Sequence, residues 1–360
     1  MKQTILCGHH QKVGARMGEF GGWDMPIQYV GILAEHAQTR ARASLFDICH
    51  MGELELSGPS AMGDLERLLT CSVETLAVGQ VRYGYLLDDG GGVLDDLTVY
   101  RLEAERYWLV VNAGTAERDV AWIEERLSEG TVFVDRSEEV AKLDLQGPLA
   151  REVLEAVCGI SVGGLGYFRC ALFDSMWVSR TGYTGELGFE LYLPVEEAGA
   201  LWEALLAHEG CEPAGLGARD TLRLEMGYPL YGHELDEAHS PVATGGGAFM
   251  DLSKPFVGRE RVEADLAVRG ERVVGLRFDS KRAAREGDGV FLGEQGVGCV
   301  TSGSLAPSLG VAVAMARVDA VASEVGAVVE VEIRGRRVDA VVVALPFYTE
   351  GTARGSVCVV

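Results

Sequence analysis

Apolar runs recur through the C-terminal part of the chain, from about Arg272 onward. The runs are short and valine-rich, turn residues separate them, and Arg334-Gly335 falls where a hairpin should reverse. Such runs are typical of the strands of a small barrel or sandwich. We therefore predict a separate C-terminal β-barrel domain over residues 271–360. Its strands are expected at residues 273–278, 297–301, 311–315, 327–333 and 338–344.

The preceding region mixes strand and helix patterns and contains an internal repeat. Leu54–Ala61 and Leu143–Ala150 each read as a strand, a Gly-Pro turn and the start of a helix. Proline is favoured in the first turn of a helix, where its missing N–H has no partner to lose. Each copy then has a glycine-rich turn that leads into an acidic strand, at 91–97 and at 185–191, and a closing helix. This order predicts duplicated α+β units with mainly antiparallel sheets. The closing helices are expected at residues 115–127 and 195–206.

Three glycines with a spacing of three, Gly182, Gly185 and Gly188, lie between two runs that read as strands. Glycine tolerates positive φ and lets other groups approach the backbone closely, so the segment is interpreted as a tight hairpin with an accessible main chain. It would deliver Glu186 and Glu190 to that surface. A phosphate-binding loop is disfavoured because no helix follows the glycines. An ordinary glycine-rich hairpin is the plain alternative.

Composition narrows the classes of function. A chain of 360 residues predicts two or three domains. Its net charge of −22 argues against sequence-independent binding of nucleic acid, which requires a basic surface. No apolar run approaches the length of a membrane span, and the first residues lack a signal-peptide pattern, so we expect a cytoplasmic protein without a membrane segment. The 8 cysteines and 7 histidines show no metal-binding spacing, so no metal is expected.

The stretch Arg180–Glu190 closely resembles the Arg-Thr-Gly-Tyr-Thr-Gly-Glu-x-Gly-x-Glu signature of the glycine cleavage T-protein family, the folate-dependent aminomethyltransferases. Further blocks that resemble the family occur in family order along nearly the whole chain. They are 20–29, 46–52, 92–97, 111–113, 146–148, 218–225, 230–233 and 300–303.

The resemblance implies a three-domain α+β architecture around a central channel, in which the barrel is the third domain. The first two domains, over residues 1–270, are then interleaved in sequence. The first is expected to comprise residues 1–51, 137–155 and 195–250, and the second residues 52–136 and 156–194.

The resemblance also implies the reaction. The family transfers the methylene unit of an aminomethyl-lipoyl group, carried by the lipoyl carrier protein (H-protein), to tetrahydrofolate and releases ammonia. Tetrahydrofolate is then a co-substrate. Because lipoyl carriers are commonly acidic, docking would need a local basic patch, for which Arg282 and Arg285 are candidates.

Asp96 corresponds by resemblance to the family's catalytic aspartate, beside the reactive folate nitrogens. A carboxylate there can orient the attacking amine, accept its proton and stabilise the iminium-like cation. Asp95 is adjacent on the same predicted strand, so its side chain should point to the opposite face.

The resemblance assigns the remaining contacts to folate. Glu190 would accept N–H groups from the pterin edge, and Arg219 would contact a carboxylate or stack on a ring. Arg223 lies four residues from Arg219, hence on the same helix face, and is expected instead to pair on the surface with Asp220 and Glu225. Other positions match groups that surround the folate, with a weaker match in the last, on the C-terminal strand. They are Tyr83, Tyr100, Asn112 and Tyr348.

Two alternatives stay open at this point. A stand-alone tetrahydrofolate-dependent demethylase would share the fold. A non-enzymatic folate-binding helper in iron–sulfur or RNA modification would also share it, but such helpers carry a Lys-Gly-Cys-Tyr-x-Gly-Gln-Glu motif, and Gly182–Gly185 lacks its cysteine. The chain departs from the family at 241–248, where Gly245-Gly246-Gly247 puts the local shape of the channel in doubt.

Overall fold

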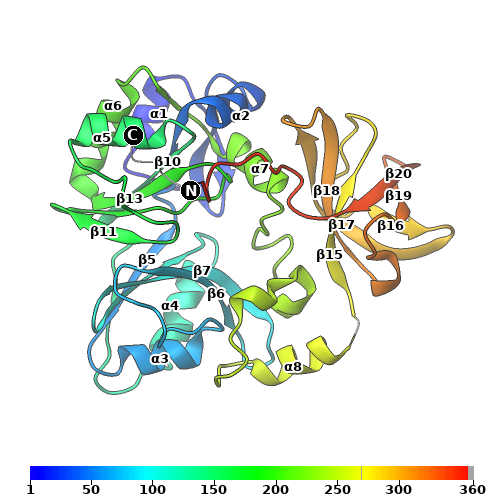
Figure 1. Cartoon of the computed structure of the whole chain (residues 1–360), viewed down its shortest axis with the longest axis horizontal. Helices are drawn as coiled ribbons and strands as arrows, with labels where there is room; N and C mark the ends of the chain where they lie inside the picture. The colour runs from blue at the N-terminus through cyan, green and yellow to red at the C-terminus, as the bar shows by residue number, and fades with distance from the viewer. Residues whose placement is uncertain (269, 356–360) are drawn as a thin grey trace.

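The computed structural model describes residues 1–268 and 270–355, which form three bodies around a common centre (Figure 1). Two bodies are built on open mixed α+β sheets and the third is a closed barrel. The predicted fold class is confirmed. No helix in the described part of the chain is long and apolar enough to cross a membrane.

The first body contains a sheet with strand order β11-β12-β13-β10-β4-β14. Helices α5 and α6 pack on it, and Leu143, Leu191 and Trp202 lie in the shared apolar core. The strands are β4 (Ala43–Asp47), β10 (Val140–Gln146), β11 (Cys170–Phe173), β12 (Met176–Ser179), β13 (Gly188–Pro194) and β14 (Cys211–Pro213), and the helices are α5 (Ala150–Cys158) and α6 (Ala198–Leu206), the latter preceded by η1 (Val195–Glu197).

The N-terminal residues add a small sheet and two helices to this body. These elements are β1 (Lys2–Gln3), α1 (Cys7–Lys12), β2 (Arg16–Phe20), β3 (Trp23–Gln28) and α2 (Ile32–Ala41).

The second body contains a sheet with strand order β6-β7-β8-β5-β9. Its core includes Leu54, Leu65 and Leu109, contributed by strands and by α3. The elements are β5 (Gly52–Ser57), α3 (Ala61–Leu68), β6 (Val81–Leu87), β7 (Val93–Glu103), β8 (Arg106–Val111), α4 (Ala116–Glu124) and β9 (Val132–Asp135).

The two sheets repeat one topology. In one copy β5, the Gly-Pro turn and α3 are followed by β6, β7 and β8; in the other β10, the Gly-Pro turn and α5 are followed by β11, β12 and β13. The strands then align in the same order, β6-β7-β8-β5 and β11-β12-β13-β10. The predicted duplication is therefore visible as topology. The equivalence of the two glycine-rich turns was wrong, because 88–92 joins β6 to β7 whereas 180–187 joins β12 to β13.

Strand pairing also corrects the expected division of residues 1–270. Residues 156–194 were assigned to the body that holds 52–136, but β12 and β13 pair with each other and β13 pairs with β10. Strands within 170–194 therefore belong to the first sheet. The reason is the duplication itself: each copy closes its sheet by returning its last strand to its own first strand. The remaining domain boundaries stay a prediction.

The barrel is closed by six strands in the order β15-β18-β17-β16-β19-β20. Arg334 and Gly335 both adopt positive φ, 52° and 72°, and reverse β19 into β20 as a two-residue turn of the type that matches strand twist. Five strands were predicted and one, β16, was missed. The strands are β15 (Arg272–Arg277), β16 (Gly289–Leu292), β17 (Gln295–Ala306), β18 (Val311–Val318), β19 (Val328–Ile333) and β20 (Arg336–Val343).

Helix α7 (Leu216–Glu225) lies where the bodies meet and contacts α2, β3, β17 and β18. Its Arg223 is buried and pairs with Glu234 at 3.1 Å and Asp220 at 2.8 Å, and it donates to Ser302 Oγ of the barrel at 2.9 Å. The expected surface pairing of Arg223 with Glu225 was wrong, because Glu225 pairs with Arg40 of α2. The segment that leads to the barrel holds η2 (Pro241–Thr244), η3 (Gly246–Phe249) and α8 (Arg259–Ala267), and η4 (Ala320–Ala322) lies within the barrel domain.

The signature glycines lie in the connection 180–187 and at the start of β13, so the loop is wider than the tight hairpin expected. Their spacing reflects close packing. A methyl group added at Gly182 or at Gly188 would collide with the side chain of Gln146 on β10, and one added at Gly185 would collide with Met226. The glycines therefore make room for side chains from neighbouring elements.

We expect Gly188→Ala to lower the free energy of unfolding by about 1–3 kcal/mol, because the added methyl group must displace Gln146 from a packed site. Chemical denaturation measures this change. The matched control is Gly63→Ala in the first turn of α3, where no atom lies within 4 Å of the new methyl group. Alanine there should stabilise the helix by up to about 1 kcal/mol. Equal effects of the two substitutions would contradict this account of the motif.

Candidate active site

Two neighbouring carboxylates on β7 share one asparagine. Asn112 donates from Nδ2 to Asp95 Oδ1 at 2.8 Å and to Asp96 Oδ1 at 3.1 Å, and its backbone N–H donates to Asp95 Oδ2 at 2.9 Å. Tyr83 on β6 donates its hydroxyl to Asp96 Oδ2 at 2.9 Å. Asp95 is fully buried whereas Asp96 is partly exposed. The side chains thus differ in accessibility as expected, although Asn112 binds both.

Burial sets the protonation of this pair. It raises the pKa of Asp96 to about 7, and the adjacent Asp95 adds to that rise. Burial, followed by the nearby Asp119, raises the pKa of Asp95 well above its usual range. Burial therefore favours the protonated form of Asp95, whereas Asp96 titrates near neutral pH. A group that titrates near the working pH is suited to proton transfer.

The Tyr83 ring is held edge-to-face by Tyr85 and Phe249, with ring centroids 5.3 and 4.8 Å away. Phe249 ends η3, which begins within the glycine run that departs from the family pattern. A methyl group at Gly246 would collide with the Tyr85 hydroxyl. The departure therefore lets this segment pack closely beside Tyr83.

A second polar group is built on the paired strands β10 and β13. Asp144 lies directly opposite Glu190 in the register, and Lys142 lies opposite Tyr192. Lys142 Nζ is 3.2 Å from Glu190 Oε1, and Arg219 of α7 forms an ion pair with Asp144. All four strand residues are buried. Both predicted folate contacts, Glu190 and Arg219, therefore lie in one charge-balanced network.

Hydroxyl groups surround the other oxygen of Glu190. Thr181 donates its hydroxyl to Oε2, and Tyr100 and Tyr192 each lie 3.4 Å from the same oxygen. The two phenol oxygens are 2.6 Å apart. The predicted Tyr100 is thus beside Glu190. Sequence reasoning missed Tyr192, Lys142 and Asp144. The signal was available, because side chains two residues apart on a strand share a face.

Tyr183 connects the two polar groups. The Arg219 guanidinium lies 5.0 Å from the centre of its ring, and Tyr228 stacks on it with ring centroids 5.6 Å apart. Burial raises the pKa of the Tyr183 phenol and the Asp96 carboxylate adds to that rise, so Asp96 lies within electrostatic reach. Tyr183 therefore lies beside Arg219 of the second group and within electrostatic reach of Asp96 of the first.

Comparisons with known proteins match this arrangement. The family model "GCVT N-terminal domain" matches residues 6–254, and "Glycine cleavage T-protein C-terminal barrel domain" matches residues 271–349. The chain belongs to the glycine cleavage T-protein family. The aminomethyltransferase of Symbiobacterium thermophilum is 43% identical, with 97% of each chain covered. That of Moorella thermoacetica is 45% identical, with 97% of this chain and 98% of the relative covered.

A solved structure agrees as well. The glycine cleavage system aminomethyltransferase T from Bartonella henselae superposes with a TM-score of 0.93 at 36% identity, covering 98% of this chain and 99% of that one. The predicted family, fold and enzyme class, an aminomethyltransferase, are confirmed. The demethylase and the folate-binding helper are not favoured, because the relatives described here are aminomethyltransferases over nearly their whole length.

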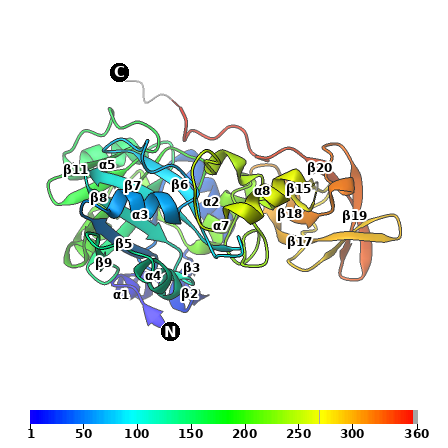
Figure 2. The same cartoon turned by 90° about the horizontal axis from the view of Figure 1, so that it is seen from below.

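Tyr348 is placed differently from the other predicted residues. It does not lie on a strand as expected, but follows β20 in an extended segment that returns from the barrel to α7 (Figures 1 and 2). Its backbone N–H donates to the Glu225 carbonyl at 2.9 Å, and the Arg40 guanidinium lies 4.1 Å from its ring centre. Its role toward folate stays a prediction. We call residues 344–355 the C-terminal strap.

Two charged residues of the T-protein signature fasten the strap. Arg180 donates to the carbonyl oxygens of Ala353 at 3.1 Å and Gly355 at 2.6 Å. Glu186 accepts from the Thr352 hydroxyl at 2.5 Å, and that hydroxyl accepts from Leu187 N–H at 2.8 Å. The strap in turn holds the loop that carries the remaining signature residues toward Glu190.

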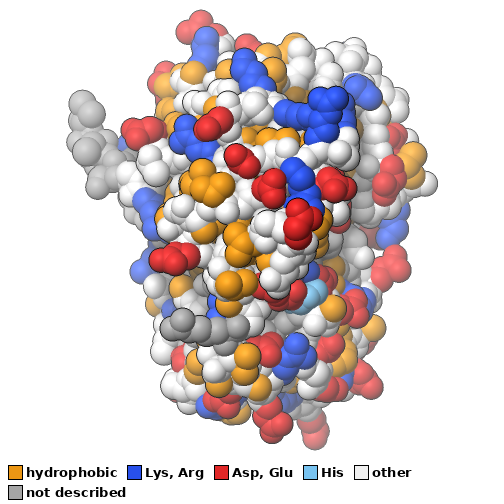
Figure 3. Space-filling view, turned by 90° about the vertical axis from the view of Figure 1, so that its right-hand side faces the viewer, with side chains coloured by type: hydrophobic (Ala, Val, Ile, Leu, Met, Phe, Trp, Pro, Cys, Tyr) orange, Lys and Arg blue, Asp and Glu red, His pale blue; other side chains and the backbone are white. Residues whose placement is uncertain are grey.

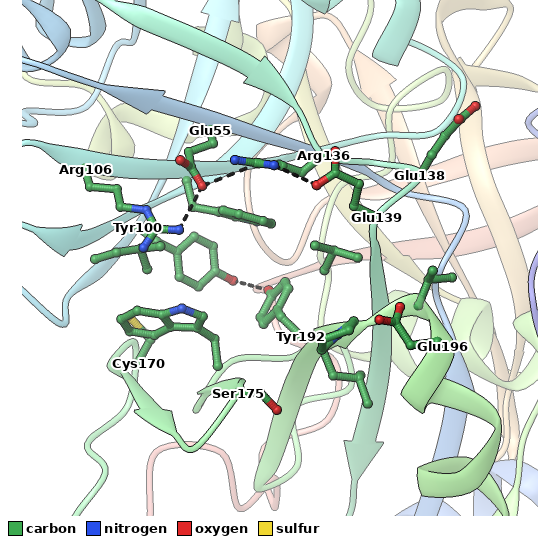
Figure 4. Close-up of a pocket in the computed structure, with 17 residues that line it drawn as sticks. Glu55, Tyr100, Arg106, Arg136, Glu138, Glu139, Cys170, Ser175, Tyr192 and Glu196 are labelled. Atoms are coloured by element: carbon green, nitrogen blue, oxygen red, sulfur yellow. Dashed lines mark hydrogen bonds and ion pairs between the residues drawn. The ribbon is translucent and has the colours of Figure 1, made fainter.

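A cleft of about 570 Å³ opens on the outer side of the Tyr100–Tyr192 pair (Figure 4). Its apolar walls include Trp108 and Trp177, and ion pairs such as Arg106 with Glu55 line its rim. Asp96 and Glu190 do not line it. In the described part of the chain, no group of three or more His, Cys, Asp or Glu side chains is placed to hold a metal ion.

We expect Thr352→Val to lower the free energy of unfolding by about 1–3 kcal/mol, because Glu186 and Leu187 N–H lose buried hydrogen bonds. The control is Thr349→Val, whose hydroxyl bonds only to the exposed Glu350 at 3.2 Å. It should change stability by less than about 0.5 kcal/mol. Equal stability of both variants in chemical denaturation would show that the strap is not held in this way.

Proposed function

We propose that this T-protein transfers the methylene unit from the aminomethyl-lipoyl group of a lipoyl carrier protein to tetrahydrofolate and releases ammonia. The observation that carries the proposal is Asp96, a partly buried carboxyl group whose two oxygens are held by Tyr83 and Asn112 and whose pKa burial raises to about 7. The two folate nitrogens lose one proton each. One reaches the departing amine as ammonia leaves, and the other reaches the lipoyl sulfur.

The donor set fits tetrahydrofolate as a co-substrate. Glu190 has four acceptor sites on its two oxygens. Thr181, Tyr100 and Tyr192 surround Oε2, whereas Lys142 is the ion partner of Oε1, so Oε1 keeps an acceptor site for an N–H group of a pterin edge. Arg219 has a planar guanidinium of which one nitrogen pairs with Asp144. Its other donors suit a folate carboxylate. Tyr100 then borders the pterin end of the site.

Asp96 is the proposed catalytic residue. In its ionised form it can accept the proton of the attacking amine and stabilise the developing cation. Tyr83 and Asn112 each donate to one of its oxygens, so the carboxylate is fixed in orientation. Fixed orientation matters because misplacement of a reacting group by about 1 Å costs about 10²-fold in rate. Tyr348, which lies in the C-terminal strap, is also proposed to contact folate.

The partner is proposed to be H-protein, in the cytoplasm, with no nucleic acid and no membrane involved. Docking of an acidic carrier would use basic side chains on the barrel. Arg282 and Arg285 are both exposed there. On the barrel face, basic side chains lie among acidic and apolar ones (Figure 3). The two arginines therefore stay candidates within a mixed surface.

We expect Asp96→Asn to lower transfer from the aminomethyl-lipoyl carrier by about 10²–10⁴-fold while tetrahydrofolate affinity changes little. Asparagine keeps the volume but cannot accept the proton. The measurement is a single-turnover assay of ammonia and methylene-tetrahydrofolate, with folate affinity measured separately by calorimetry.

Asp95→Asn is the matched control. Because Asp95 is fully buried and burial favours its neutral, protonated form, a neutral asparagine should alter the charge of the site little. Its effect on the rate should be far smaller. A damaging Asp95→Asn with a near-normal Asp96→Asn would refute the assignment of Asp96, and a wild-type chain that binds no tetrahydrofolate would refute the proposed function.

A further inference from the structure

Lys142 is a lysine buried in the middle of a strand, 2% exposed. A buried ammonium group is unfavourable unless an opposite charge compensates it. Its nitrogen lies 3.2 Å from Glu190 Oε1, 3.8 Å from Met51 Sδ and 5.3 Å from the centre of the Tyr192 ring. The carboxylate of Glu190 is thus its ion partner among these neighbours.

The two other nearby carboxyl groups, those of Glu53 and Asp144, bind other partners. Burial raises the pKa of Glu53 to about 8, so this group is neutral, and Trp108 Nε1 donates to it at 2.6 Å. Asp144 is engaged by Arg219 and also accepts from Gln146 Nε2 at 2.6 Å. The positive charge of Lys142 also lowers the pKa of Glu53 and of Asp144, but its ion-pair partner within the described residues is Glu190.

We infer that Lys142 is a positioning residue for folate binding, which keeps Glu190 ionised and oriented so that its carboxylate accepts an N–H group of the pterin. The inference rests on the proposed function, because it assumes that Glu190 binds the pterin. It assigns Lys142 no contact with folate. Lys142 acts through the carboxylate that it neutralises.

Physical reasoning supports this role. Glu190 is 6% exposed, and burial alone would raise its pKa and favour the protonated acid. Lys142, followed by the Thr181 hydroxyl and Arg219, outweighs burial and lowers the pKa of Glu190. A protonated acid would offer fewer acceptor sites to the pterin. The titratable or charged groups that face Glu190 are Lys142 and Asp144 on β10, Tyr192 on β13, Tyr100 on β7, Arg219 on α7 and Glu53 on β5.

The test is a double-mutant cycle with Lys142→Met and Glu190→Gln, singly and together. Tetrahydrofolate affinity is measured by calorimetry at about pH 6 and about pH 8.5, each variant relative to wild type, so that the titration of Asp96 cancels. Lys142 also lowers the pKa of Asp144 and of Glu53, and the Glu190→Gln background reports the effect of Lys142→Met on those two groups. Removing Lys142 raises the pKa of Glu190. Affinity should then fall by up to about tenfold for each pH unit below the new pKa, and recover at the higher pH.

Two further variants separate positioning from mere structural support. Lys142→Arg keeps the positive charge and should follow the wild-type pH response. In the Glu190→Gln background, Lys142→Met should cause no further loss of affinity. A loss that is equal at both pH values, or equal in both backgrounds, would overturn the inference. Failure of the wild-type chain to bind tetrahydrofolate would instead overturn the proposed function.

A second measurement does not depend on the folding of the Lys142 variant. Infrared difference spectra between the wild-type chain and Glu190→Gln report the protonation of Glu190 directly. The inference expects the bands of an ionised carboxylate at about pH 6, where an unpaired buried glutamate would be protonated. The carbonyl band of a protonated acid at this pH would overturn it.

Discussion

The pairing of β10 with β13 is the constraint on which the site depends. Its register places Gln146 opposite Gly188 and Asp144 opposite Glu190. The first juxtaposition explains why the signature needs glycine, since Gln146 fills the space of a side chain at positions 182 and 188. The second brings two buried carboxylates together. Their charges are tolerated because Lys142 and Arg219 neutralise them.

The same loop is held from the opposite side by the strap. Arg180 of the signature donates to the carbonyl oxygens of Ala353 and Gly355, and Glu186 accepts from the Thr352 hydroxyl. These bonds tie the barrel domain to the loop that carries Thr181. Helix α7 adds a second tie, because its Arg223 binds Ser302 on β17 while its Arg219 reaches the site. The barrel domain is thus tied to the first body at two places, by the strap and by α7.

Much of this could be read from the sequence. Short valine-rich runs separated by turn residues predicted the barrel, and the repeated order of strand, Gly-Pro turn and helix predicted a duplicated fold. Both patterns could be recognised because they are local in the chain. The pairing of β13 with β10 could not be predicted, since strand partners depend on contacts between distant residues. For the same reason residues 156–194 were assigned to the wrong sheet. Arg223 was expected on the surface, but it is buried and forms an ion pair with Glu234.

The candidate site was predicted in part. Asp96, Glu190, Arg219, Tyr83, Tyr100 and Asn112 were named by resemblance. The structure joins Asp96 to Tyr83 and Asn112, and it places Tyr100 and Arg219 in the polar network of Glu190. Tyr348 was expected on a strand but lies in the strap. Lys142 and Asp144 were missed because a charged residue in a strand pattern is ordinarily assigned to the solvent face. Only the tertiary structure shows that this face of β10 is covered.

Asp96 is proposed to accept the proton of the attacking folate amine, and burial raises the pKa of this carboxyl group to about 7. The pH dependence of single-turnover transfer by the wild-type chain, with saturating tetrahydrofolate and carrier, tests it most directly. A base must be ionised to act, so the rate should rise with pH through about 7 and level off above it. A rate that is flat, or that falls, as the pH rises through 7 would contradict the account.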